Sequence, residues 1–90
     1  MEKAPRAAST PRVLVVEDES DIAALIAYQL TREGFRVETA ANGPDALKAV
    51  NREIPDLIVL DRMLPGLSGD EVLKSLKTEP STRTIPVLVL

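Results

Sequence analysis

Three uninterrupted runs of aliphatic residues constrain this chain more than any other feature of its sequence. Each run is four residues long, and the runs occupy positions 13–16, 57–60 and 87–90. A short apolar run of this kind, bounded by polar residues, is typical of a strand that is buried on both faces. Such strands occur in parallel sheets that are covered by helices. The runs therefore favour a parallel sheet enclosed between helices.

The segment after the first run is predicted to form a helix. Residues 20–33 place apolar side chains at intervals of three and four, so one face of the helix is apolar. That face consists of Ile22, Leu25, Ile26 and Leu30. We expect it to be the buried face, and we expect Gly34 to end the helix in a left-handed conformation.

The remaining segments complete an alternation of strands and helices. Residues 35–39 alternate apolar and polar side chains, which is typical of a half-exposed strand. A second helix is predicted to begin at Pro44, and a third at Gly69, where Ser68 and Glu71 match a capping box. The order β-α-β-α-β-α-β predicts an α/β fold with a doubly wound parallel sheet.

The composition excludes several classes of function. The 90 residues include no cysteine and no histidine, which excludes a disulfide framework, a thiolate nucleophile, imidazole metal ligands and a Ser-His triad. One Phe, one Tyr and a net charge of −3 argue against a nucleic-acid-binding surface. The aliphatic runs are much shorter than the roughly 18 residues of a membrane span. We expect a cytoplasmic protein that binds neither nucleic acid nor a membrane.

Two of the three aliphatic runs end directly in acidic residues. Glu17 and Asp18 follow the first run, and Asp61 follows the second. Ligands of doubly wound sheets bind beyond the carboxyl ends of the strands, so adjacent strands would bring these carboxylates together. Their mutual repulsion would be relieved by Mg²⁺, which prefers oxygen ligands. The alternatives are that Glu17 and Asp18 only favour the start of a helix, and that Asp61 only begins or caps a loop.

Four segments together resemble the receiver domains of two-component response regulators. They are residues 15–19, 57–61, 61–69 and 85–87. The pattern Asp-x-Met-Leu-Pro-Gly-x-Ser-Gly, followed by Thr-Arg-x-Ile-Pro-Val, is most similar to the OmpR/PhoB group of transcription regulators. The resemblance begins at about residue 12 and continues to residue 90. It implies the flavodoxin-like receiver fold and a role in signal transduction.

The resemblance also implies a role for individual residues. Asp61 is implied to be the phosphoacceptor, and Pro65 and Gly69 to shape the loop that follows it. The implied Mg²⁺ ligands are Glu17, Asp18, Asp61 and the backbone carbonyl of Met63. The implied partner is a sensor histidine kinase, which donates the phosphoryl group from a phosphohistidine. The implied output is the regulation of transcription.

The resemblance further implies residues that the sequence does not contain. Receiver domains continue beyond the fourth strand with a Ser or Thr, a fifth strand, a Lys and two more helices. We therefore expect residues 12–90 to form a receiver domain that is incomplete at its C-terminus, and residues 1–11 to form a flexible leader. An uncovered strand edge would favour a homodimer or self-association of strand edges.

Two other functions remain open at this point. A pseudo-receiver would keep the fold and act as a binding module without being phosphorylated. A Mg²⁺-dependent phosphatase of the haloacid-dehalogenase type would also use an aspartate at the end of a strand. That class requires Asp-x-Asp, whereas Asp61 is followed by Arg62 and Met63. We therefore predict a phosphoacceptor and not an enzyme.

Overall fold

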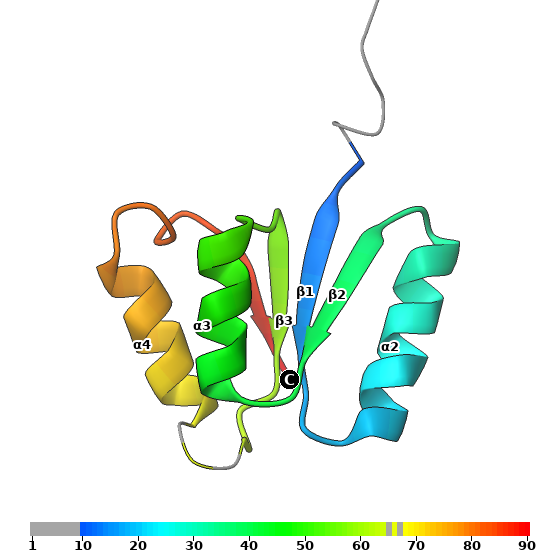
Figure 1. Cartoon of the computed structure of the whole chain (residues 1–90), viewed down its shortest axis with the longest axis horizontal. Helices are drawn as coiled ribbons and strands as arrows, with labels where there is room; N and C mark the ends of the chain where they lie inside the picture. The colour runs from blue at the N-terminus through cyan, green and yellow to red at the C-terminus, as the bar shows by residue number, and fades with distance from the viewer. Residues whose placement is uncertain (1–9, 65, 67) are drawn as a thin grey trace, which may run out of the picture.

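The computed structural model describes residues 10–64, 66 and 68–90, and its strands and helices alternate along the chain (Figure 1). The strands are β1 (Arg12–Val16), β2 (Arg36–Ala40), β3 (Leu57–Leu60) and β4 (Val87–Val89). The helices are α2 (Ser20–Arg32), α3 (Gly43–Arg52) and α4 (Gly69–Thr78). The predicted order of elements is confirmed. Of the helices in this described part, none is long and apolar enough to cross a membrane.

The four strands form one parallel sheet in the order β2-β1-β3-β4. Helices α3 and α4 cover one face of this sheet and α2 covers the other, as Figure 1 shows. The α/β fold with a doubly wound sheet is therefore confirmed. Because β1 lies directly beside β3, with Val16 in register with Leu60, their carboxyl ends meet at one edge of the sheet.

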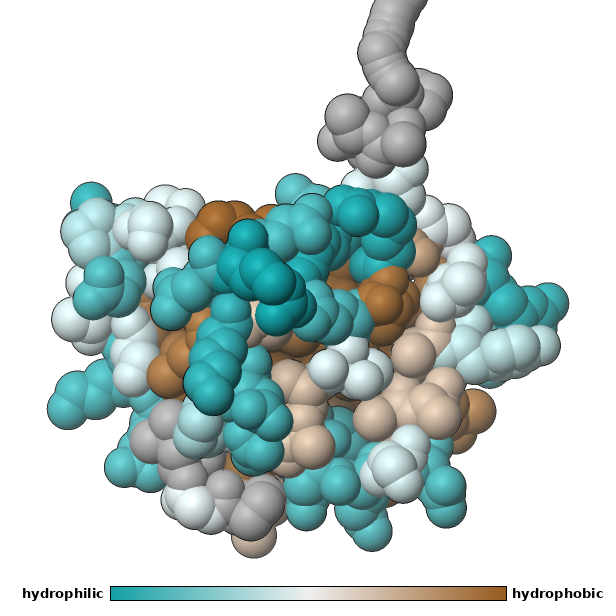
Figure 2. All heavy atoms as spheres, in the orientation of Figure 1, coloured by the Kyte–Doolittle hydropathy of each residue, from teal (hydrophilic) through white to brown (hydrophobic). Residues whose placement is uncertain are grey.

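Each face of the sheet has its own core, because side chains along a strand point alternately to opposite faces. Toward α3 and α4, the core includes Leu14, Val16, Ile58, Leu60, Val50, Val72 and Leu76. Toward α2, it includes Val13, Val15 and Val59, with Ile26, Leu30 and Phe35 packed against them. Every residue of β1 is buried. Figure 2 shows hydrophilic residues over most of the visible face, with apolar residues in the gaps between them.

Strand β4 differs from the other two aliphatic strands. Leu88 is 56% exposed, and Val87 and Val89 are only half-buried. Within the described part of the chain β4 pairs with β3 alone, so it is an edge strand. Among the described residues, β4 therefore has the uncovered edge and the exposed apolar surface that were expected of the fourth strand.

The prediction for the inner face of α2 is partly wrong. Ile26 and Leu30 pack against the core as expected, but Ile22 is 41% exposed and Leu25 is 60% exposed. The face turned toward the sheet is instead centred on Ala23, which is buried. Ala23, Ile26 and Leu30 follow one another at intervals of three and four and so share one face of the helix, which leaves Ile22 and Leu25 away from the core.

The ends of the helices follow the local sequence signals closely. Ser68 and Glu71 form the predicted capping box at the start of α4. Helix α3 begins at Gly43, one residue before the predicted Pro44, because the Asn42 side chain accepts a hydrogen bond from the Asp45 backbone N–H. Helix α2 ends at Arg32, and Gly34 has the expected left-handed conformation with φ of 98°.

An ionic network joins β1, β2 and the end of α3 at the amino ends of the strands. The guanidinium of Arg12, whose residue is 5% exposed, contacts both Glu38 and Glu53. Glu38 also contacts Arg52, and Glu53 lies 3.1 Å from Arg36. Each of these two glutamates therefore has two arginine partners. The backbone N–H of Arg12 also donates to a carboxylate oxygen of Asp56 at 2.8 Å.

Candidate functional site

Backbone hydrogen bonds at the carboxyl ends of β1 and β3 hold the acidic residues in place. The N–H of Asp61 donates to the carbonyl of Val16 at 2.9 Å, and the N–H of Glu17 donates to the carbonyl of Ala40 at 3.0 Å. The hydrogen-bonding pattern of the sheet thus continues one residue beyond each strand. As a result, the acidic residues begin their loops from the rigid edge of the sheet.

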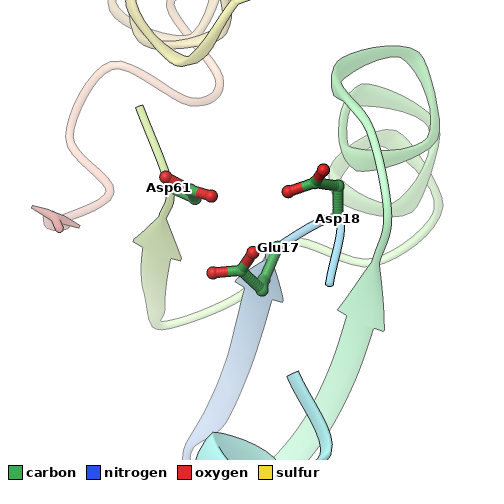
Figure 3. A group of neighbouring side chains, drawn as sticks. All are labelled: Glu17, Asp18 and Asp61. Atoms are coloured by element: carbon green, nitrogen blue, oxygen red, sulfur yellow. The ribbon is translucent and has the colours of Figure 1, made fainter. Parts of the chain in front are cut away.

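Three carboxylates converge at this edge. Glu17, Asp18 and Asp61 each offer one oxygen, and these oxygens all lie within 4.8 Å of one another. Figure 3 shows the side chains of Asp18 and Asp61 facing each other, with Glu17 between them on the side of the sheet. Glu17 is buried, Asp61 is half-buried and Asp18 is exposed. Together they are the acidic cluster of this structure.

The acidic cluster carries unbalanced negative charge. Burial, the largest effect, raises the pKa of Glu17, and the charge of Asp61 and hydrogen bonds to Asp61 and Asp18 raise it further. The N–H of Glu19, which donates to Glu17 Oε2 at 3.1 Å, lowers the pKa but does not cancel these effects. No Lys or Arg among the described residues forms an ion pair with the cluster.

The loop after β3 is tied closely to Asp61. The N–H of Met63 donates to Asp61 Oδ1 at 3.0 Å, and the Met63 side chain extends into solvent. A Cβ atom on Gly69 would lie 2.5 Å from the carbonyl oxygen of Asp61 and 2.6 Å from the Cα of Arg62. Only glycine allows α4 to begin this close to the acidic cluster. Pro65, the other residue expected to shape the loop, lies outside the described residues.

An open groove that was not predicted from the sequence lies beside the acidic cluster. A cavity of about 430 Å³ lies between α2 and β2 and has Glu17 and Asp18 at one end. Its other lining residues are mainly small: Ser20, Ala23, Ala24, Ala27, Val37, Thr39, Ala40 and Ala41. The only signal in the sequence is the concentration of alanines in α2. The groove leaves one side of the cluster accessible from solvent.

The donor set suits a hard cation. Carboxylate and carbonyl oxygens are the ligands that Mg²⁺ prefers, and Mg²⁺ sites in proteins commonly use one or two carboxylates and retain several waters. The acidic cluster provides three carboxylates at a partly exposed edge, where water ligands can also be accommodated. The arrangement can therefore hold a divalent cation.

Comparison with known proteins identifies the family. The response regulator receiver domain family matches residues 13–90. The chain therefore belongs to this family, which confirms the resemblance seen in the sequence. Receiver domains of response regulators are signalling modules.

Individual relatives agree with this assignment. The chain is 41% identical over 80 residues to the phosphate regulon transcriptional regulatory protein PhoB of Rhizobium meliloti, covering 89% of this chain and 35% of that protein. It is 48% identical over 79 residues to the alkaline phosphatase synthesis transcriptional regulatory protein PhoP of Bacillus subtilis, covering 88% of this chain and 32% of that protein. These relatives agree with the similarity to the OmpR/PhoB group. The chain spans about a third or less of the length of the curated relatives described here.

Solved structures show the same fold. The N-terminal domain of a response regulator receiver protein from Methanoculleus marisnigri is 42% identical and superposes with a TM-score of 0.85. That superposition covers 88% of this chain and 64% of the other. The signal receiver domain of a histidine kinase from Syntrophus aciditrophicus is 33% identical, with a TM-score of 0.87, and covers 90% of this chain and 61% of the other. The flavodoxin-like receiver fold is therefore confirmed.

Proposed function

We propose that this receiver domain, residues 12–90, accepts a phosphoryl group on the carboxylate of Asp61 in the presence of Mg²⁺. The proposed Mg²⁺ ligands are Glu17, Asp18, Asp61 and the backbone carbonyl of Met63. The observation that carries the proposal is the convergence of three carboxylates within 4.8 Å at the carboxyl ends of adjacent strands. Acids that only favoured a helix start or a loop would not need to converge from two different strands.

The chemistry needs positioning and charge neutralisation. A carboxylate is a weak nucleophile toward phosphorus, and the oxygens of a phosphate group repel it, so phosphoryl transfer depends on holding both groups in place. A bound divalent cation supplies the positive charge that these groups lack. The protein orients Asp61 through its own backbone at β3 and through the Met63 N–H on Oδ1.

The proposed donor is a phosphohistidine on a sensor histidine kinase. This sequence contains no histidine, so it can act only as the acceptor in such an exchange. The product, an aspartyl phosphate, adds about two negative charges to an edge that is already acidic. A charge change of this size can bias a two-state element of the fold. We propose that the natural output is the regulation of transcription, exerted in the cytoplasm.

Self-association through β4 is a second part of this proposal. Strand β4 pairs only with β3 in the described part, and Leu88 is 56% exposed beside its free edge. An exposed apolar edge strand presents unpaired backbone groups that a second copy can pair with. Light scattering over a concentration series would show a dimer if this holds and a constant monomer mass if it does not.

Incubation with Mg²⁺ and acetyl phosphate tests the phosphoacceptor role. We expect one labile phosphoryl adduct on the natural chain and none on Asp61→Asn. Asp21→Asn is the matched control, because it makes the same change of charge at an exposed position in the first turn of α2. Intact-mass spectrometry before and after mild base treatment would detect the adduct.

The same experiment separates the alternatives. Sustained release of phosphate over many turnovers would favour the phosphatase. Mg²⁺ binding without any adduct on the natural chain would favour the pseudo-receiver and would contradict the phosphoacceptor. An equal adduct on Asp61→Asn would place the acceptor elsewhere.

A further inference from the structure

Met63 is a large apolar side chain in an unexpected position. It is 80% exposed, more than any other large hydrophobic residue that the structure describes, and it lies two residues after Asp61. Its thioether makes no contribution to either core. Packing therefore does not explain why a sulfur-containing side chain lies at the rim of the acidic cluster.

Met63 is also fixed to the proposed acceptor through its backbone. Its N–H donates to Asp61 Oδ1 at 3.0 Å, so the base of the side chain cannot move away from the carboxylate without breaking this bond. The thioether beyond it is unbranched and flexible. A chemical change at the sulfur would therefore occur on a side chain whose backbone is anchored to the reacting carboxylate.

Met63 is the only sulfur-containing residue in the described part of the chain. The sequence contains two methionines and no cysteine, and the other methionine is Met1. Exposed methionine is readily oxidised to the sulfoxide, which converts an apolar side chain into a polar one and is reversible by methionine sulfoxide reductases. Oxidation would thus be directed to a single place in residues 10–90.

We propose that Met63 is a redox-modification site, and that hydrogen peroxide converts it to the sulfoxide and slows phosphoryl acceptance by Asp61. The inference rests on the proposed function. In the reaction, a sulfur lone pair attacks one peroxide oxygen, the O–O bond breaks and an S–O bond forms. The proton on the attacked oxygen passes to the departing oxygen, which leaves as water. Sulfur is oxidised by two electrons and the peroxide is reduced by two.

The expected effect follows from charge. A sulfoxide oxygen carries partial negative charge, and here it would belong to a residue whose backbone is hydrogen-bonded to Asp61, one of three carboxylates that lack cationic partners among the described residues. Phosphoryl donors are anionic, so the approach of the donor would meet additional repulsion. We expect the rate of acceptance from acetyl phosphate to fall about threefold, as for a weak repulsion at a partly exposed site.

The test compares peroxide-treated and untreated protein. Proteolysis after Arg62 and Lys74 releases fragment 63–74, whose mass reports the oxidation of Met63 separately from that of Met1. The rate of Asp61 phosphorylation by acetyl phosphate and Mg²⁺ is then measured before treatment, after treatment, and after repair with a methionine sulfoxide reductase. Met63→Leu goes through the same series and is compared only with its own untreated rate, since it retains Met1 but cannot be oxidised at position 63.

The results expected are oxidation of fragment 63–74, a rate about threefold lower, recovery after repair, and no response to peroxide in Met63→Leu. The inference is overturned if Met63 resists peroxide that oxidises free methionine, or if fully oxidised protein reacts at the untreated rate. It is also overturned if Met63→Leu loses as much rate as the natural chain. Absence of any adduct on untreated protein is a different result, because it would contradict the proposed function itself.

Discussion

Both ends of the sheet gather carboxylates, but among the described residues only the cluster at the amino ends is paired with arginines, since Arg62 at the carboxyl ends pairs with Asp70 and not with the acidic cluster. At the amino ends, Glu38 and Glu53 each contact two arginines, and Arg12 joins them from the buried strand β1. At the carboxyl ends, Glu17, Asp18 and Asp61 face one another, and within the described residues no arginine or lysine pairs with them.

This contrast shows which acids serve the fold and which serve a site. At the amino ends, where β1, β2 and the end of α3 meet, arginines neutralise the two glutamates. Carboxylates that serve the fold are thus paired within the protein. Leaving a buried glutamate such as Glu17 beside two aspartates costs stability, and burial raises its pKa accordingly. A cost of this kind is expected where the balancing charge comes from a ligand in solution.

Gly69→Ala should cause the largest loss of stability and should distort the acidic end. The new Cβ would lie 2.5 Å from the carbonyl oxygen of Asp61, which is backbone and cannot rotate away. Relief requires α4 or the end of β3 to shift, at a cost of about 3 kcal/mol. Urea unfolding followed by circular dichroism would measure this loss, and phosphorylation of Asp61 should slow in the same variant.

Gly66→Ala is the matched control in the same loop. Gly66 has φ of 71° but open space around the position of a Cβ. An alanine there costs about 1 kcal/mol of left-handed backbone strain without a collision. Equal losses in the two variants would show that the close approach of Gly69 to Asp61 does not matter.

Arg12→Met should have the next largest effect, this time at the amino ends. The substitution keeps an apolar stem but leaves Glu38 and Glu53 facing each other with one partner fewer each. Breaking a fully buried ion pair costs about 3–5 kcal/mol. The loss here should be smaller, about 2 kcal/mol, because both glutamates are partly exposed and because Arg12 Nη1 is already buried without a partner among the described residues. Thermal and urea unfolding would measure it.

Arg36→Met provides the comparison for that variant. The Arg36 pair with Glu53 is exposed on both sides, and such pairs contribute about 0–1 kcal/mol. If Arg36→Met destabilised the protein as much as Arg12→Met, burial of Arg12 would not be what distinguishes this end of the sheet.

The sequence predicted the alternation of elements well because the signals for it are local. Aliphatic runs, the Ser68 and Glu71 capping box and the glycine after α2 each act within a few residues. The inner face of α2 was predicted less well, because hydrophobicity favoured Ile22 and Leu25 over the smaller Ala23. Which side of a helix faces a sheet depends on how closely the backbones can approach, and this is a tertiary property.

The candidate site was predictable only in part. Local sequence shows that Glu17, Asp18 and Asp61 follow strands, but their convergence depends on β1 lying beside β3, and strand order is not a local property. The resemblance to receiver domains implied the roles of these residues, which the local sequence pattern alone could not predict. The Arg12 network had no signal in the sequence, because its members are separated by many residues and meet only after folding.

Among the three principal substitutions, at Gly69, Arg12 and Glu17, Glu17→Gln should change stability least, and its effect should depend on pH. The folded protein holds the Glu17 proton more tightly than the unfolded chain does. Protonation of Glu17 therefore contributes to the free energy of unfolding, and this contribution is fully present below the pKa of the unfolded state. It is lost as the pH rises through the raised pKa of the folded state. At neutral pH without Mg²⁺, the variant should therefore be more stable than the natural chain, on the order of 1 kcal/mol.

Acidification and Mg²⁺ should each reduce that difference, for separate reasons. Below the unfolded pKa of Glu17 the natural side chain is neutral in both states, so the two proteins should converge in stability. At neutral pH, Mg²⁺ should stabilise the natural chain more than Glu17→Gln, because a ligand that binds only the folded state raises stability by an amount that grows with the logarithm of its affinity. Urea unfolding at three pH values, with and without Mg²⁺, would measure both effects. A variant no more stable than the natural chain at neutral pH without Mg²⁺ would show that Glu17 is not under electrostatic strain, and the contrast between the two ends of the sheet would lose its energetic basis.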